Sequence, residues 1–340
     1  MLNPVVPAAA AAILFLAPTL TASVVTVGKR CPGARAYTLP QALDMAQAGD
    51  DVRLCPGAYT VPAEGLAVNK TGVRIASFGP AGSVKVKPER KPPQGSRAAA
   101  FIVAAGGVQI EGLDIRGFSG PGILVESGTE GAPVILKRNR VHHNRVGIEL
   151  RPGAHTLLLH NSVFGNLEHG ILIDAAGKSR AEVIGNTVVN NSAGPGFTAG
   201  IEVRNAGGTV LIAHNECRGN AVGLRLKASS GVAVEDNDLS RNRLGLDLVS
   251  ASDNRIRENR INDNTRLAGV WIRSQSARNQ FHHNEATRNR HDGIFVLNDG
   301  STGNEFTNNR LAGNLLHGLH LSTAPVRPPG VAASGVNSDK

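Results

Sequence analysis

Charged residues recur at two positions of a phrase that the chain repeats, and their types could support chemistry on an acidic sugar. Removing a proton beside a sugar carboxylate needs a cation that neutralises the carboxylate and a base that takes the proton. The carboxylates of Asp174, Glu202 and Asp247 could hold Ca²⁺ for the first task. Arg225 or Lys227 would serve as the catalytic base if its surroundings favoured the neutral form.

Aromatic and basic side chains at the same two positions predict a surface for binding sugars. Trp271, Phe295 and His320 would stack on sugar rings, and Arg204 and Arg273 would bind carboxylates. The alternative is that opposite charges in neighbouring copies pair only with each other across parallel strands and bind nothing. The sequence leaves structural pairing, a carbohydrate groove and a catalytic centre open.

The elements that must position these side chains belong to a repeat that runs from residue 132 onward. Each copy has two Asn residues five positions apart, then Gly and two apolar residues that flank a variable one, and copies begin 22 to 29 residues apart. Between Asn191 and Gly200 the connection spans nine residues, where other copies use three to five, so this insert is predicted to overhang Glu202 and wall a groove. The Asn pairs are Asn139/Asn144, Asn161/Asn166, Asn186/Asn191, Asn215/Asn220, Asn237/Asn242, Asn259/Asn264, Asn284/Asn289 and Asn309/Asn314.

Four further columns of the repeat are apolar in every copy, and their alternation predicts short strands with one buried face. Gly and Asn between the strands supply the turns. Such a short unit cannot bury its apolar side alone, so it must stack on its neighbours. The predicted fold is all-β: a single-stranded right-handed parallel β-helix, or solenoid, with a short N-terminal capping helix.

Three kinds of residue in the repeat are assigned structural roles. The stacked Asn side chains are predicted to hydrogen-bond along the axis as a ladder. The His142-His143 pair falls inside an Asn interval, whereas His282-His283 falls in a different register, so we expect His142 and His143 to be solvated turn residues rather than metal ligands. Cys217 occupies an apolar column and is predicted to be a buried, unreactive thiol.

The region before the repeat is predicted to close the solenoid. Thr38 would cap a short helix that has apolar positions at Leu39, Leu43 and Ala46 and ends at Gly49. Such a helix would cover the exposed edges of the first coil. The predicted divisions are a signal peptide at 1–23, an N-terminal cap with the first coils at 24–106, β-helix repeats at 107–324 and a disordered tail at 325–340.

The N-terminus and two cysteines predict export to the periplasm or the extracellular space. An apolar stretch ends in small residues at Thr21-Ala22-Ser23, and Pro7 and Pro18 make it a poor membrane-spanning helix, so no transmembrane segment is expected after leader removal. Cys31 and Cys55 are predicted to form a disulfide. The net charge of +9 suits an acidic partner such as an anionic polysaccharide, a lipid headgroup surface or nucleic acid, and composition alone does not choose among these. Export and the 4% aromatic content argue against nucleic acid.

The opening TLPQALDMAQAGDDVRLCPGAY and the Asn-Gly repeats resemble secreted bacterial right-handed parallel β-helix proteins of the pectin-lyase-like superfamily. The resemblance covers nearly the whole chain after the leader. That superfamily includes pectate and alginate lyases, mannuronan epimerases, polygalacturonases and periplasmic accessory proteins for the copper site of nitrous oxide reductase. The Asp-Pro-His-Asp motif of the epimerases is absent, and Trp271-Ile272-Arg273-Ser274 keeps only the first half of the Trp-Ile-Asp-His phrase of pectate lyases.

Two functions follow from the residues and the resemblance. The first is an exported protein that binds an acidic polysaccharide or cell-envelope glycan and, if it is an enzyme, belongs to the lyase, epimerase or glycosidase class, with Ca²⁺ as the cofactor if it uses one. It predicts that Arg225→Ala and Trp271→Ala weaken glycan binding while the fold survives. The second is a non-enzymatic periplasmic accessory or scaffold protein of the copper-site maturation type, or an adhesin, with an envelope protein as its partner.

Overall fold

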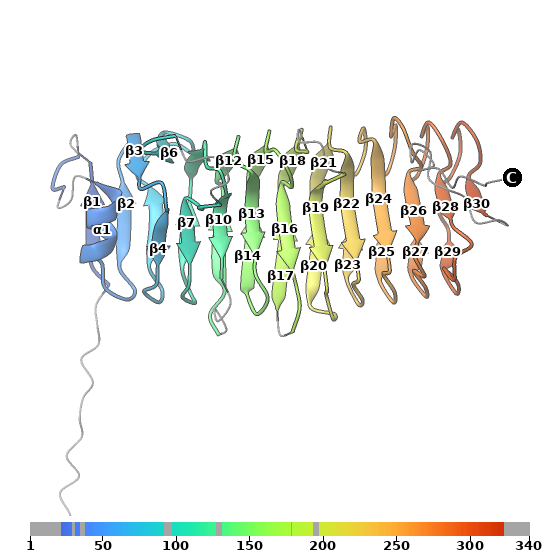
Figure 1. Ribbon diagram of the computed structural model, residues 1–340, viewed down its shortest axis with the longest axis horizontal. Coiled ribbons are helices and arrows are strands. Elements are labelled where there is room, and N and C mark those ends of the chain that lie inside the picture. The colour runs from blue at the N-terminus through green and yellow to red at the C-terminus, as the bar shows by residue number, and fades with distance from the viewer. Residues whose placement is uncertain are drawn as a thin grey trace, which may run out of the picture.

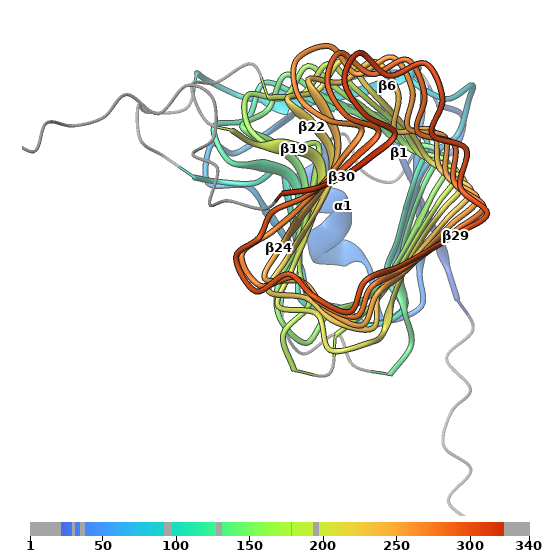
Figure 2. The same ribbon diagram turned by 90° about the vertical axis from the view of Figure 1, so that its right-hand side faces the viewer.

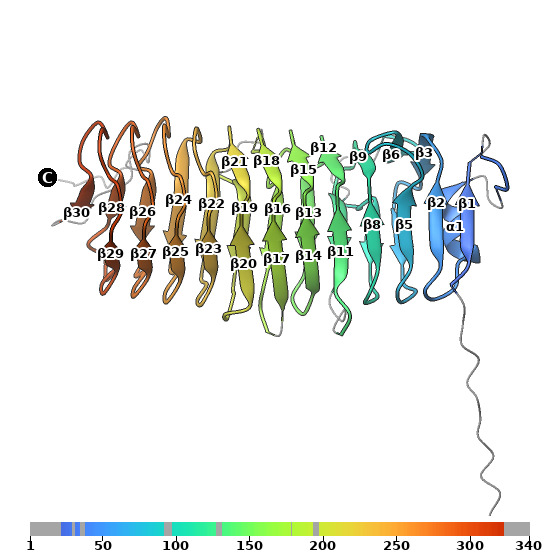
Figure 3. The same cartoon turned by 180° about the vertical axis from the view of Figure 1, so that it is seen from behind.

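The chain winds into a long solenoid built from three parallel sheets (Figures 1 and 3). The computed structural model describes residues 22–28, 31–34, 38–91, 97–126, 131–177, 179–192 and 197–322. The prediction of an all-β parallel solenoid is therefore confirmed. Almost all of the predicted leader and all of the predicted tail lie outside the described residues.

Each coil contributes strands to the sheets in turn, so that strands adjacent in a sheet come from successive coils. Figure 2 looks along the axis and shows the sheets as the sides of the coil. Sheet A holds β1 (Val24–Val27), β2 (Asp51–Leu54), β5 (Arg74–Ser77), β8 (Gln109–Glu111), β11 (Val134–Lys137), β14 (His155–Leu159), β17 (Arg180–Ile184), β20 (Val210–Ala213), β23 (Ala233–Glu235), β25 (Arg255–Arg257), β27 (Gln280–His282) and β29 (Glu305–Thr307). Sheet B holds β3 (Gly57–Val61), β6 (Val84–Pro88), β9 (Leu113–Arg116), β12 (Arg140–His142), β15 (Ser162–Phe164), β18 (Thr187–Val189) and β21 (Glu216–Arg218). Sheet C holds β4 (Leu66–Val68), β7 (Phe101–Val103), β10 (Pro121–Val125), β13 (Val146–Leu150), β16 (Ile171–Asp174), β19 (Ala199–Arg204), β22 (Val222–Lys227), β24 (Leu244–Val249), β26 (Val270–Arg273), β28 (Ile294–Val296) and β30 (Leu319–Leu321).

The predicted apolar columns form the core of the solenoid. The column that follows the glycine is fully buried from Ile148 to Ile294, and the thiol of Cys217 is buried as predicted, which raises its pKa. The glycine itself is needed for close stacking, because a Cβ on Gly245 would lie 2.6 Å from the carbonyl oxygen of Gly269. At the C-terminal end the apolar columns are no longer fully buried, and Leu319 and Leu321 are exposed.

The Asn pairs form two ladders along the axis, as predicted. In the first ladder, Oδ1 of Asn215 accepts from the backbone N and Nδ2 of Asn186 at 2.9 and 3.0 Å. Nδ2 of Asn215 donates to the carbonyl oxygen of Val183 at 2.7 Å and to Oδ1 of Asn237 at 2.9 Å. Every rung therefore satisfies buried backbone groups as well as its neighbours. A third ladder that the sequence reading missed joins Asn254, Asn279 and Asn304.

Helix α1 (Leu39–Met45) lies at the N-terminal end of the solenoid (Figures 1 and 2). Thr38 and Gln41 form a capping box, which confirms the predicted start. The helix ends at Met45 rather than at Gly49, since the backbone of Ala46 is already extended, with ψ of 145°. Nζ of Lys70 donates to carbonyl oxygens of the last turn, including that of Leu43 at 2.8 Å. No helix in the described ranges is long and apolar enough to cross a membrane.

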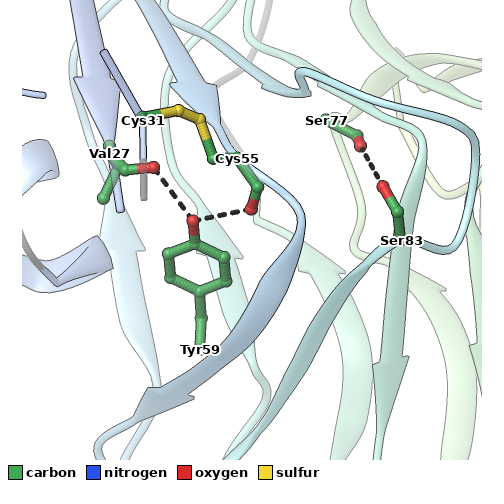
Figure 4. The surroundings of a disulfide bond; sticks show 6 residues. All are labelled: Val27, Cys31, Cys55, Tyr59, Ser77 and Ser83. Atoms are coloured by element: carbon green, nitrogen blue, oxygen red, sulfur yellow. Dashed lines mark hydrogen bonds between the residues drawn. A yellow bond between two sulfur atoms is a disulfide. The ribbon is translucent and has the colours of Figure 1, made fainter. Parts of the chain in front are cut away.

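Cys31 and Cys55 are paired as a disulfide with their Cα atoms 6.1 Å apart, within the usual range (Figure 4). Next to the bridge, the hydroxyl of Tyr59 donates to the carbonyl oxygens of Val27 and Cys55, which lie 2.9 and 2.8 Å away. The bridge and the tyrosine thus tie β1 to the turn before β3.

Cys31→Ser is expected to lower the free energy of unfolding by about 3 kcal/mol under oxidising conditions, because the bridge restricts the unfolded chain. Urea denaturation of wild type and variant would measure the difference, which dithiothreitol should abolish. Equal stability without reductant would mean that the bridge does not stabilise the fold.

Candidate functional site on sheet C

The outward face of sheet C carries two side-chain columns, which together are called the outer strip here. The strand register places Glu202 beside Arg225, Arg225 beside Asp247, and Asp247 beside Trp271, as the sequence predicted. The column continues through Phe295 and His320. The second column runs through Asp174, Arg204, Lys227, Val249 and Arg273.

Arg225 is the centre of a buried charge network on the outer strip. Its Nε donates to Oδ2 of Asp247 at 2.8 Å, and its Nη1 lies 3.3 Å from Oε2 of Glu202. Only 7% of Arg225 is exposed. The guanidinium therefore balances two carboxylates on neighbouring strands rather than facing solvent.

Asp247 is completely buried, at 0% exposure, and a second arginine reaches it. Nε and Nη2 of Arg273 donate to Oδ1 and Oδ2 of Asp247, both at 3.0 Å. The guanidinium of Arg273 also lies over the ring of Trp271, 4.9 Å from its centroid. This arginine bridges the charged and aromatic parts of the outer strip.

Glu202 has two further basic neighbours. Nε of Arg204 lies 3.5 Å from its Oε1, and Nδ1 of His169 lies 3.8 Å from its Oε2. Burial lowers the pKa of His169, although Glu202 acts to raise it. Nδ1 of His169 also accepts from the backbone N of Ala199 at 3.2 Å, which fits a neutral ring. The sequence reading missed His169 because it stands directly before Gly170, outside the two outward columns.

The described end of the long insert contacts the network. The carbonyl oxygen of Phe197 accepts from Nη1 of Arg225 at 2.7 Å, and the Phe197 ring centroid is 5.0 Å from the guanidinium carbon. Residues 193–196 of the insert lie outside the described residues. The described end of the insert therefore covers Arg225, which itself contacts Glu202, the residue that the insert was predicted to overhang.

The aromatic residues of the strip pack against one another. Trp271 and Phe295 are each 7% exposed, and their ring centroids lie 6.3 Å apart. They join an apolar cluster that includes Val222, Leu244 and Ala268. His320 lies 4.9 Å from the Phe295 ring. Most of the surface predicted for stacking on sugars is therefore covered by protein.

The three carboxylates predicted to hold Ca²⁺ do not converge. Arg225 stands between Glu202 and Asp247 in the strand register, and Asp174 lies in the second column, where its Oδ1 accepts from Nδ2 of Asn205 at 3.1 Å. The guanidinium of Arg225, the first predicted base, is held as a donor between the carboxylates of Asp247 and Glu202.

The second column keeps its basic groups accessible. Lys227 is exposed, Arg204 beside it is partly exposed, and so is Arg273, which follows after Val249 in the column.

The expectation that His142 is a solvated turn residue is wrong. His142 ends β12, is 6% exposed and stacks on Phe164 at 4.5 Å. Its Nε2 lies 3.1 Å from Oδ1 of Asp114. Burial lowers the pKa of His142, although Asp114 acts to raise it. His143 is exposed with φ of 53°, as expected for a turn.

Comparisons with known proteins agree with the architecture. The sequence matches the family described as "Right handed beta helix region" over residues 94–210 and 196–311. No curated protein matches the chain.

Three solved structures share the fold at low sequence identity. The A-module of mannuronan C-5 epimerase AlgE4 from Azotobacter vinelandii is 18% identical, with a TM-score of 0.63 over 82% of this chain and 90% of that one. A tailspike protein, Dettilon, is 15% identical with a TM-score of 0.56, over 80% of this chain and 62% of that one. A mutant of the periplasmic alginate epimerase AlgG is 15% identical with a TM-score of 0.51, over 77% of each chain. The predicted right-handed parallel β-helix is confirmed.

Proposed function

Because the chain belongs to the right-handed β-helix family, we propose that it binds an acidic polysaccharide along the outer strip of sheet C. The observation that carries this proposal is the row of accessible cations in the second column, namely Arg204, Lys227 and Arg273. Adjacent strands repeat at about 4.8 Å, so the sheet holds these charges at fixed spacings along one line.

Buried carboxylates keep this row in place. Arg204 pairs with Glu202, and Arg273 pairs with Asp247, so two of the three cations are anchored from below. Pre-positioned cations lose less conformational entropy on binding a polyanion than free side chains do. The net charge of +9 favours the approach of such a partner.

Two further observations support the proposal. Two of the solved structures that share the fold are named as epimerases of mannuronan and alginate. The disulfide of Cys31 and Cys55 fits an oxidising compartment outside the cytoplasm. We assign binding rather than turnover, because Arg225, one of the two predicted bases, is held in the buried network.

Lys227→Glu is expected to weaken binding to alginate or pectate roughly tenfold at low salt, since it places a like charge in the binding row. Lys227 is exposed, so the fold should survive, whereas Arg225→Ala and Trp271→Ala would remove buried side chains. Calorimetry against a panel of acidic and neutral polysaccharides would measure the affinity. Binding should also fall steeply towards 1 M salt, where the screening length is about 3 Å.

Arg255→Glu is the matched control, because Arg255 is an exposed strand residue on sheet A. Equal weakening by both substitutions, or no binding to any acidic polysaccharide, would refute the outer strip as a glycan site. The second outcome would favour the accessory or adhesin function. An unsaturated, ultraviolet-absorbing product, scored with and without Ca²⁺, would add a lyase activity to the binding proposed here.

A further inference from the structure

The residue before each strand-opening glycine changes character at the C-terminal end of sheet C. In three successive coils it is Val222, Leu244 and Ala268, whose side chains pack together with Trp271 and Phe295 of the outer strip. In the next two coils it is Asp292 and His317. The row of apolar side chains at this position is therefore followed by a carboxylate and an imidazole on neighbouring coils.

Three histidines surround Asp292. Nδ1 of His317 lies 2.8 Å from Oδ1, and the backbone N of His317 donates to the same oxygen at 3.0 Å. The Nδ1 atoms of His291 and His320 lie 2.7 and 3.3 Å from Oδ2. The ligand atoms that Asp292, His317 and His320 offer all lie within 4.8 Å of one another.

The charge of Asp292 is not balanced in the way that the charge of Asp247 is. Both aspartates are 0% exposed, and Asp247 is paired with two arginines. Within the part of the chain that the structure describes, Asp292 has only His291, His317 and His320 as ion-pair partners. None of these partners is an arginine or a lysine, and a buried carboxylate that lacks such a permanent counter-charge is costly. A divalent cation would supply it.

We propose that Asp292, His317 and His320 bind a divalent transition-metal ion, with Zn²⁺ as the best fit, at the C-terminal end of the outer strip. Imidazole ligands favour zinc, whereas Ca²⁺ and Mg²⁺ prefer all-oxygen sites. With bonds of about 2.1 Å, neighbouring ligand atoms of a tetrahedral zinc site lie about 3.4 Å apart. Nδ1 of His317 lies 2.8 Å from Oδ1 of Asp292 and Nδ1 of His320 lies 3.3 Å from Oδ2, so each ring is within this range of one oxygen of the same carboxylate.

The surroundings of the three ligands suit a metal that keeps an open position. Two histidines and one carboxylate leave the fourth position for water, and the exposed side of His317 gives that position access to solvent. His291 holds Oδ2 of Asp292 from outside the ligand set, and the Phe295 ring packs on His320. Contacts of this kind fix the ligand orientations.

Untagged protein stripped with EDTA is expected to bind one Zn²⁺ per chain and to bind Ca²⁺ at least a hundredfold more weakly. Titration calorimetry and metal analysis after dialysis would measure both. His317→Gln and His320→Gln should each weaken zinc binding at least tenfold, since each removes one of three ligands. Both rings are partly exposed, so circular dichroism should show an unchanged fold.

His214→Gln is the matched control, because Nδ1 of His214 lies 2.8 Å from Oδ2 of Asp236, and no third metal-ligating side chain joins this pair among the described residues. It should leave zinc affinity unchanged. So should Lys227→Glu, because the metal site does not depend on glycan binding. The proposal would be overturned if both ligand variants bound zinc as tightly as the wild type, or if the control lost as much zinc affinity as they do. It would also be overturned if the protein bound Ca²⁺ as tightly as Zn²⁺.

Discussion

Arg225→Met is expected to lower the free energy of unfolding by roughly 3–5 kcal/mol, the usual effect of breaking a buried ion pair from one side. Methionine keeps much of the packing volume of the stem but leaves Asp247 with one arginine instead of two. It also removes a partner of Glu202 and leaves the Phe197 carbonyl oxygen without its donor. Urea denaturation followed by circular dichroism would measure the loss.

Arg255→Met separates the effect of the network from that of removing any arginine from a strand. Arg255 is exposed on β25, so its replacement should change the stability by no more than about 0.5 kcal/mol. A loss below 1 kcal/mol for Arg225→Met would mean that water or a rearranged side chain compensates both carboxylates. The pairing interpretation of the outer strip would then fail.

The fold was predictable because its signals are local and repeated. The five-residue Asn spacing and the alternation around each glycine give strand positions and register without any knowledge of contacts. Hence Ile148, Cys217 and the column from Glu202 to Asp247 lie where the sequence placed them. The end of α1 was not predictable in this way, because the partner of its last carbonyl oxygens, Lys70, lies in a later part of the chain.

Burial on the outer face was not predictable, because it depends on contacts between coils. Alternation shows that Arg225 and Trp271 point outward, but the side chains that cover them come from other coils. His142 was misjudged for the same reason, since Asp114 lies 28 positions away. Asp292 was not predicted as a site residue, because it stands directly before the glycine and this position was not assigned to the outward face. Sequence periodicity therefore predicts whether a side chain points outward, whereas the exposure of that side chain depends on its neighbours in the adjacent coils.

Asn215→Ala is expected to destabilise the protein by roughly 3–6 kcal/mol, since an unsatisfied buried polar group costs about 1–3 kcal/mol and the substitution leaves several. The backbone N and Nδ2 of Asn186 lose their acceptor, and the carbonyl oxygen of Val183 loses a donor. Oδ1 of Asn237 loses the Nδ2 donor and keeps only the backbone N of residue 215. Alanine fits sterically, so the loss reports hydrogen bonding rather than a clash. The midpoint of urea unfolding would measure it.

Asn69→Ala provides the comparison, because Asn69 is exposed and lies outside the three ladders, so the loss of stability should be within about 0.5 kcal/mol. A solenoid makes this contrast especially informative. Each coil contacts only its neighbours, so a gap in one ladder weakens the interface on both sides of that coil. If Asn215→Ala were as mild as Asn69→Ala, apolar stacking alone would hold the coils together. The ladders would then set the register of the strands without contributing to their stability.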